Sequence, residues 1–171
     1  MSNVFTSGAR KVIPAVLIYV RRGDEILMVH RNGDSPGDYH SGKWNGLGGK
    51  CEANESMLET AQRELREESG LELSADAFRP LGFLQFPNFK AHKQEDWLVS
   101  VFVAQINGDT EGLLKRGPEG DLHWIAADRL LELNLWAGDR HFIPYVLAGK
   151  PFMSTIWYEG ERVQRHWIQA L

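Results

Sequence analysis

The chain has 171 residues and a formal net charge of −4, with 43% apolar and 25% charged residues. These values are typical of a globular protein with a sizeable core, and they argue against a disordered chain. The mild acidity argues against non-specific binding to polymeric nucleic acid, which needs a basic surface.

Hydrophobic patterning predicts strands and helices along the chain, with turn signals between them. We expect one domain over residues 1–171, in which residues 1–11 are a flexible lead-in. Because strands come before, between and after the helices, the pattern predicts an α+β fold with a helix on each side of a mixed sheet. The strands are expected over residues 12–20, 26–31, 81–86, 97–106, 122–125, 153–158 and 162–167, and the helices over residues 56–69, 127–133 and 139–147.

The helix over residues 56–69 is the clearest element of the pattern. Asn54 is expected to cap its start and Gly70 its end. Its apolar residues recur at the three- and four-residue spacing of one buried helix face. They are Leu58, Ala61 and Leu65.

Three glutamates of this helix are expected to share one face. Glu64, Glu67 and Glu68 are three and four residues apart, so their like charges repel one another. Residues 50–72 contain seven acidic and three basic residues, and this window therefore carries the whole net charge of the chain. A solvated helix face explains such a cluster, and so does a site for Mg²⁺ or Mn²⁺, which prefer carboxylate oxygens as ligands.

A glycine-rich segment lies before the helix at a specific spacing. Gly48 and Gly49 allow the backbone to approach a phosphate or to offer a carbonyl to a metal. From Gly49 through Glu55 to the run Arg63–Leu71, the sequence resembles the 23-residue signature of the Nudix hydrolases. The resemblance implies a Nudix-type α/β/α sandwich around a mixed β-sheet. It also implies Mg²⁺- or Mn²⁺-dependent cleavage of nucleoside diphosphates linked to another group.

The resemblance also implies roles for single residues. Glu64, Glu67 and Glu68 are expected to hold the metal, with the Gly48 carbonyl as a further ligand. Within the signature, structural roles fall to Gly49, Glu55, Arg63 and Gly70, and the Glu55–Arg63 salt bridge is expected to tie the loop to the helix.

Glu119 is the candidate for a further carboxylate from outside the signature, as metal ligand or general base. A turn carboxylate in water is the other interpretation of this residue, which lies in a Gly-Pro-Glu-Gly-Asp segment. The sequence leaves open which carboxylate is the general base.

Three further segments, residues 44–50, 133–140 and 151–167, resemble the MutT-like branch of this family. Its members hydrolyse oxidised purine nucleoside triphosphates. The mammalian counterpart has two adjacent aspartates in the second segment, whereas this chain has Gly138 followed by Asp139. Recognition through a pair of aspartates is therefore not expected here.

The side chains of these segments are suited to a purine pocket. Asn45 offers one acceptor and two donors, and Asp139 can accept from a base or donate when it is protonated. Trp136 and Tyr39 can stack on a ring. Each has a structural alternative, namely an Asn-Gly turn for Asn45, a helix N-cap for Asp139 and a core position for Trp136.

Arg31 and Lys50 are the candidates for phosphate binding, with solvated surface positions as the alternative. The sequence thus predicts a Mg²⁺-dependent enzyme that cleaves nucleoside triphosphates to monophosphate and pyrophosphate, of the 8-oxo-dGTP type. The alternatives are a Nudix hydrolase of ADP-ribose, a dinucleoside polyphosphate or a nucleotide sugar, and a nucleotide-binding sensor without catalysis.

Cysteine content and apolar run lengths bear on the compartment. Cys51 is the single cysteine, which excludes an internal disulfide and is typical of the cytoplasm. The apolar run over residues 12–20 is shorter than the roughly 20 residues of a membrane span, so no membrane partner is expected. The oligomeric state is not predicted.

Overall fold

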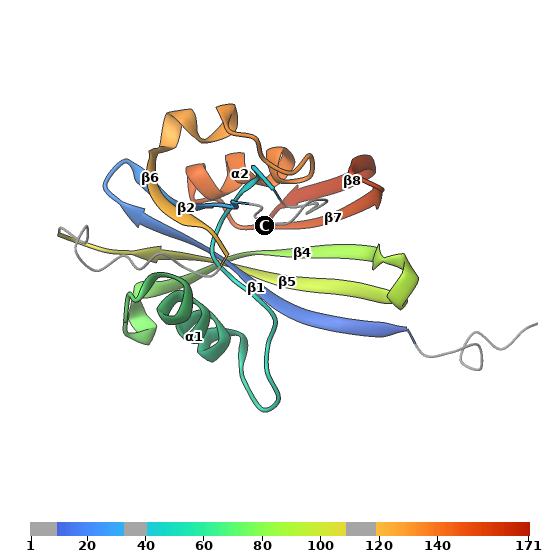
Figure 1. The fold of residues 1–171 in the computed structure, drawn as a ribbon, viewed down its shortest axis with the longest axis horizontal. Helices are drawn as coiled ribbons and strands as arrows, with labels where there is room; N and C mark the ends of the chain where they lie inside the picture. Colours follow the sequence, from blue (N-terminus) through green and yellow to red (C-terminus); the bar gives the residue numbers. More distant parts are fainter. Residues whose placement is uncertain (1–9, 33–40, 109–118) are drawn as a thin grey trace, which may run out of the picture.

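The computed structural model describes residues 10–32, 41–108 and 119–171. Within these residues, eight strands form a sheet and two α-helices pack against it (Figure 1). The strands are β1 (Lys11–Arg22), β2 (Glu25–His30), β3 (Trp44–Asn45), β4 (Phe78–Lys90), β5 (Glu95–Gln105), β6 (Asp121–Ala126), β7 (Phe152–Glu159) and β8 (Arg162–Ala170). The helices are α1 (Met57–Ser69) and α2 (Asp139–Ala148), with 3₁₀ turns η1 (Ala75–Ala77), η2 (Ala91–Lys93) and η3 (Ala127–Glu132).

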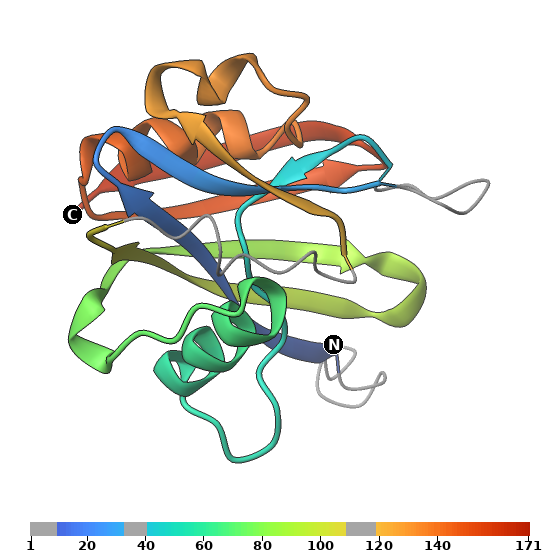
Figure 2. The ribbon, with the colours of Figure 1, turned by 60° about the vertical axis from the view of Figure 1, so that its left-hand side comes forward.

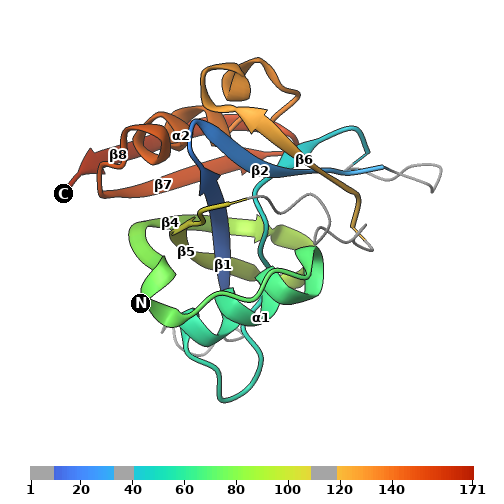
Figure 3. The ribbon, with the colours of Figure 1, turned by 90° about the vertical axis from the view of Figure 1, so that its left-hand side faces the viewer.

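The sheet is mixed, as expected. Its strand order is β3-β2-β1-β5-β4-β7-β8, and β6 pairs with β2. The β1–β5 and β4–β7 pairs are parallel, and the remaining pairs are antiparallel. Figures 1 and 3 show α1 on one side of β1, β5 and β4, and α2 on the other side, and Figure 2 shows the same separation from an intermediate direction. This arrangement is the predicted sandwich.

Strand β1 separates two apolar layers because successive side chains of a strand point to opposite faces. Ala15 and Tyr19 belong to the cluster beneath α2, whereas Val16, Ile18 and Val20 belong to the cluster beneath α1. A strand that is buried on both faces reads as a continuous apolar run, which explains the uninterrupted pattern in the sequence.

Helix α1 begins two residues later than an Asn54 cap requires, so the predicted cap is wrong. Ser56 is the N-cap, because its hydroxyl accepts from the Glu59 N–H while the Glu59 carboxylate accepts from the Ser56 N–H. This reciprocal pair is a capping box. Gly70 ends the helix in the left-handed conformation with φ 77°, as predicted.

Two other expectations need correction. Asn45 lies in β3, paired with Val29 of β2, so Asn45 and Gly46 do not form the Asn-Gly turn that was considered for them. The segment predicted as a helix over residues 127–133 is the 3₁₀ turn η3. At Asn45, pairing with a distant strand overrides the local turn signal.

Residues 10 and 11, which were expected to belong to a flexible lead-in, form defined contacts. Arg10 forms an ion pair with Asp96 at 2.6 Å, and Lys11 begins β1 opposite Glu95. In the part of the chain that the structure describes, none of the helices is long and apolar enough to cross a membrane.

Candidate active site

A pocket of about 640 Å³ is lined by residues of both helices, among them Glu64 of α1 and Asp139 of α2. It brings together residues from β1, the β3–α1 loop, α1, the β4–β5 hairpin and α2. Ten of the predicted site residues line it, namely Arg31, Asn45, Gly48, Gly49, Lys50, Arg63, Glu64, Glu119, Trp136 and Asp139. Glu55, Glu67, Glu68 and Gly70 do not line it, and Tyr39 lies outside the described residues.

Acidic side chains converge at one end of this pocket. Glu68 is buried, and burial together with the nearby charges of Glu119 and Glu64 raises the pKa of its carboxyl. Its Oε2 accepts a hydrogen bond from the Gly48 N–H at 2.9 Å. Burial also raises the pKa of Glu64. Both shifts mean that the fold takes these carboxyl groups away from water, which disfavours their charged forms.

Gly48 and Gly49 permit the close packing of this end. Gly48 has φ 146°, and a Cβ there would lie 2.1 Å from the Val16 carbonyl oxygen of β1. A Cβ on Gly49 would lie 2.3 Å from Oε1 of Glu64. Only glycine fits either position without moving β1 or the glutamate.

Arg63 forms the predicted bridge between loop and helix. Its Nε donates to Glu55 at 2.7 Å, and its second terminal nitrogen donates to the Lys50 carbonyl at 3.0 Å. The Arg63 hydrogen bond is the main cause that lowers the pKa of Glu55 to about 2. Arg63 therefore holds the loop between β3 and α1 against the helix, beside the glutamates of α1.

The same guanidinium also contacts the candidate metal ligands. Arg63 Nη1 lies 2.8 Å from Glu64 and 3.2 Å from Glu67, whose side chain is 53% exposed. With these contacts in place, no group of three acidic, histidine or cysteine side chains among the described residues is arranged to hold a metal ion. The donor set nevertheless fits a hard divalent cation, because carboxylate and backbone carbonyl oxygens are the ligands that such cations prefer. A cation would replace Arg63 as the partner of Glu64 and Glu67.

Glu119 joins this cluster from a distant part of the sequence. Its carboxyl lies within hydrogen-bond reach of Glu68 and forms an ion pair with Arg31. The following Gly120 has φ 151°, and a Cβ there would lie 2.1 Å from the His30 carbonyl oxygen. Gly120 thus allows the turn that carries Glu119 to pack closely on the end of β2. The Glu119 side chain remains 42% exposed in this turn, and that of Arg31 is 25% exposed.

The other end of the pocket is aromatic with a few polar groups. Phe86, Trp97 and Tyr158 form its wall beside Asn45 and Asp139. Trp136 is half-buried and lines the pocket, with the Lys43 ammonium 5.2 Å from its ring centre, so the core interpretation of this residue is wrong. Phe86, Trp97 and Tyr158 were missed in the sequence because isolated aromatic residues in strands give no signal beyond burial.

Asp139 is the first residue of α2 and not its cap. Gly138 is the N-cap residue, without a side-chain cap, and its N–H donates to the Tyr158 hydroxyl at 2.8 Å. Burial raises the pKa of Asp139 to about 7, against smaller lowering effects of Lys43 and Arg140. A Cβ on Gly138 would lie 2.2 Å from the Tyr158 hydroxyl oxygen, which explains why a second aspartate does not fit before Asp139.

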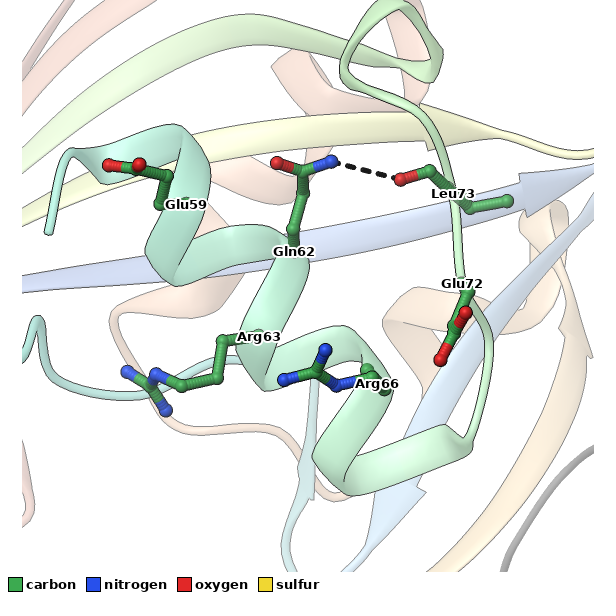
Figure 4. A pocket seen from close by; sticks show the side chains of 6 residues that line it. All are labelled: Glu59, Gln62, Arg63, Arg66, Glu72 and Leu73. Carbon is green, nitrogen blue, oxygen red and sulfur yellow. Dashed lines mark hydrogen bonds between the residues drawn. The ribbon is translucent and has the colours of Figure 1, made fainter.

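A second, smaller hollow of about 270 Å³ lies on the outer side of α1 (Figure 4). Gln62 donates from Nε2 to the Leu73 carbonyl at 3.0 Å and so ties α1 to the segment that follows it. Arg66 and Glu72 lie below this bond in Figure 4. The hollow has no aromatic side chain in its lining, and we assign it a structural role.

Comparison with known proteins agrees with this geometry. Residues 11–146 match the NUDIX domain, and the chain therefore belongs to the family of Nudix hydrolases. It is 31% identical over 160 residues to the "Oxidized purine nucleoside triphosphate hydrolase" of Danio rerio, covering 94% of this chain and 92% of the relative. The Mus musculus protein of the same name is 32% identical over 123 residues, covering 72% and 74%.

A solved structure supports the fold in the same way. The crystal structure of a MutT protein from Bacillus halodurans superimposes with a TM-score of 0.75 at 27% identity. The superposition covers 91% of this chain and 97% of that one.

Proposed function

We propose that this Nudix hydrolase cleaves nucleoside triphosphates to a monophosphate and pyrophosphate, and that its preferred substrates are oxidised purine nucleotides of the 8-oxo-dGTP type. The observation that carries the proposal is the continuous pocket that joins a carboxylate cluster to an aromatic end with Asn45 and Asp139. Its two ends match the two ends of a nucleotide. The names of the Danio rerio and Mus musculus relatives support the same substrate class.

The acidic end is assigned to the phosphate chain. Glu64, Glu67, Glu68 and Glu119, with the Gly48 carbonyl, would hold Mg²⁺ or Mn²⁺. When bound, such a cation neutralises phosphate charge and lowers the pKa of the attacking water. Arg31, which pairs with Glu119, and Lys50, whose ammonium lies 5.2 Å from the Trp97 ring centre, both line the pocket and would bind phosphate oxygens. Glu119 and Glu68 are both candidates for the general base, since both lie where the carboxylates converge.

The aromatic end is assigned to the nucleobase. Trp136 and the wall of Phe86 and Tyr158 would stack on the ring. Asn45 and Asp139 would read its hydrogen-bonding edge, because an amide offers donors and an acceptor and a carboxyl accepts, or donates when it is protonated.

A panel of nucleotides tests the proposal. With Mg²⁺ present, 8-oxo-dGTP should be hydrolysed with release of pyrophosphate and a higher kcat/KM than dGTP, dATP or pyrimidine triphosphates. Release of orthophosphate alone would contradict the proposed bond cleavage. Faster turnover of ADP-ribose, a dinucleoside polyphosphate or a nucleotide sugar would contradict the proposed preference for oxidised purine triphosphates. Tight nucleotide binding without turnover would indicate a sensor.

A further inference from the structure

Two lysines of the pocket contact the same indole ring. Lys50, in the loop before α1, and Lys90, at the end of β4, both line the pocket. Their ammonium nitrogens lie 5.2 and 5.0 Å from the centre of the Trp97 ring, which is within the range of cation–π contacts. Two cations from distant parts of the sequence therefore meet on one aromatic surface.

The sheet brings Lys50 and Trp97 together. Lys50 forms a β-bridge with Ala15 of β1, and Ile13 of the same strand lies opposite Trp97 of β5. Alternate residues of a strand share a face, so Ile13 and Ala15 place their partners on one face of the sheet. This is the face from which both Lys50 and Trp97 line the pocket.

An irregularity in the β4–β5 hairpin brings Lys90 to the same ring. Phe86 lies opposite Trp97 and Lys90 opposite Glu95, whereas a regular ladder would place Asn88 opposite Glu95. Asn88 instead adopts a left-handed conformation with φ 56°. Extra residues in one strand of a pair redirect its side chains, and the bulge therefore gives the position beside Trp97 to a lysine. The Glu95 carboxylate accepts from the Trp97 indole nitrogen at 3.2 Å, which holds the ring in place.

The charges of the two lysines are not neutralised by a salt bridge. Within residues 10–32, 41–108 and 119–171, neither ammonium pairs with a carboxylate. Burial, and then the charges of Lys50 and Lys93, lower the pKa of Lys90 against a smaller opposite effect of Glu95. The fold thus keeps like charges close together, and a bound anion would relieve their repulsion. Lysine binds phosphate in this way, as a point charge.

We propose that Lys90 is a further substrate-binding residue, which together with Lys50 binds the two phosphates that leave as pyrophosphate. The proposal deepens the proposed function and rests on it for the substrate. Lys50 directly follows the glycine segment beside the glutamates of α1, so the lysine pair adjoins the end assigned to the phosphate chain. Lys50 is exposed, and Phe89 beside Lys90 is 41% exposed. The pair therefore lies on the open side of the pocket, toward which a nucleotide with a buried base extends its outer phosphates.

The substitution Lys90→Met tests the proposal, with Lys93→Met as the matched control. Lys93 belongs to the same hairpin, is exposed and does not line the pocket. Methionine keeps an apolar stem over the Trp97 ring and removes the charge. With Mg²⁺ present, calorimetry should show the Kd of inorganic pyrophosphate raised about tenfold in Lys90→Met. Lys93→Met should bind pyrophosphate as the wild type does.

The monophosphate product distinguishes phosphate binding from a structural role. 8-oxo-dGMP lacks the two outer phosphates, so its Kd should change by less than about twofold in Lys90→Met, while kcat/KM for 8-oxo-dGTP should fall about tenfold. Lys90→Arg keeps the charge and should retain the affinity for pyrophosphate within about threefold. If Lys90→Met does not fold, Lys90→Gln provides the same comparison.

An unchanged Kd for pyrophosphate in the variant without the Lys90 charge would overturn the proposal, and so would equal losses for pyrophosphate and 8-oxo-dGMP. Two outcomes separate this inference from the proposed function. Selective loss of pyrophosphate binding in a protein that hydrolyses no nucleoside triphosphate would support the lysine pair and contradict the proposed function. Hydrolysis of 8-oxo-dGTP with an unchanged kcat/KM in Lys90→Met would support the proposed function and overturn the role of Lys90.

Discussion

Glu68 combines burial, a backbone hydrogen bond and two acidic neighbours in one side chain. Because its pKa is raised above the ordinary value of 4.5, its contribution to stability is complete below pH 4.5 and is lost as the pH rises through the raised pKa. The same side chain is needed as a charged ligand. At neutral pH the metal-free protein is therefore destabilised by the group that we assign to catalysis.

The substitution Glu68→Gln separates these two effects. In EDTA, the fall in unfolding free energy between pH 5 and about 8 should be smaller in Glu68→Gln than in the wild type, because a buried charge is removed. Adding Mg²⁺ should raise the Tm of the wild type and raise that of Glu68→Gln less. Hydrolysis should fall by at least about 100-fold. Urea unfolding and calorimetry measure the first two effects.

Glu67→Gln is the matched control for this experiment. Glu67 is exposed, so its substitution should leave the pH dependence of stability unchanged, although hydrolysis should fall as well. Equal pH dependence in the wild type and Glu68→Gln, or full activity in both variants at saturating Mg²⁺, would argue against the assigned roles.

At the scale of elements, helix α1 is defined by its ends as much as by its apolar stripe. The capping box of Ser56 and Glu59 satisfies backbone donors at its start, and Arg63 ties the preceding loop to its side through Glu55. These contacts fix the position of α1 along the loop, so that Glu64 lies beside Gly49 and Glu68 beside Gly48. Asn54 lies in a left-handed turn with φ 69° before the cap.

The cap can be tested by two substitutions. Ser56→Ala should lower the unfolding free energy by about 1 kcal/mol, because the Glu59 N–H loses its acceptor. Asn54→Gly removes the other candidate cap and keeps the left-handed backbone, so it should change stability by only a few tenths of a kcal/mol. Urea denaturation measures both values, and a larger loss in Asn54→Gly would favour the cap that the structure rejects.

At the scale of the whole molecule, the nucleobase end is assembled from segments that are far apart in the sequence. Gly138 at the start of α2 meets Tyr158 of β7 through a hydrogen bond of 2.8 Å. Tyr158 in turn contacts Phe86 and Phe89 of β4, with ring centres 6.2 and 5.8 Å away. This contact places Asp139 and the aromatic wall in one pocket.

Gly138→Ala should lower the unfolding free energy by about 1–3 kcal/mol, because its Cβ would overlap the Tyr158 hydroxyl. Tyr158→Phe removes the overlapping oxygen, so the double variant should be more stable than the sum of the single effects predicts, by at least about 0.5 kcal/mol. Urea denaturation of the four proteins measures this coupling. Additive effects would show that the two positions do not interact in solution.

The sequence by itself determined the elements whose signals are local. The apolar stripe and Gly70 predict α1, and strands are predicted on both sides of Gly160, where β7 and β8 form a hairpin. The spacing from Gly49 to Leu71 predicts the family and the glutamate face. These features are readable because helix period, turn chemistry and short-range spacing depend on neighbouring residues alone.

Only the tertiary structure decided which residues meet across the sheet. The sequence does not show that Glu119 reaches Glu68, or that Tyr158 fills the space beside Gly138. Nor does it show that the Tyr19 ring packs closely against Gly46. Each of these contacts depends on strand order and register, since a shift of one residue turns a side chain to the opposite face of the sheet. Long-range packing therefore decided the shape of the pocket, while local sequence decided the chemistry available to it.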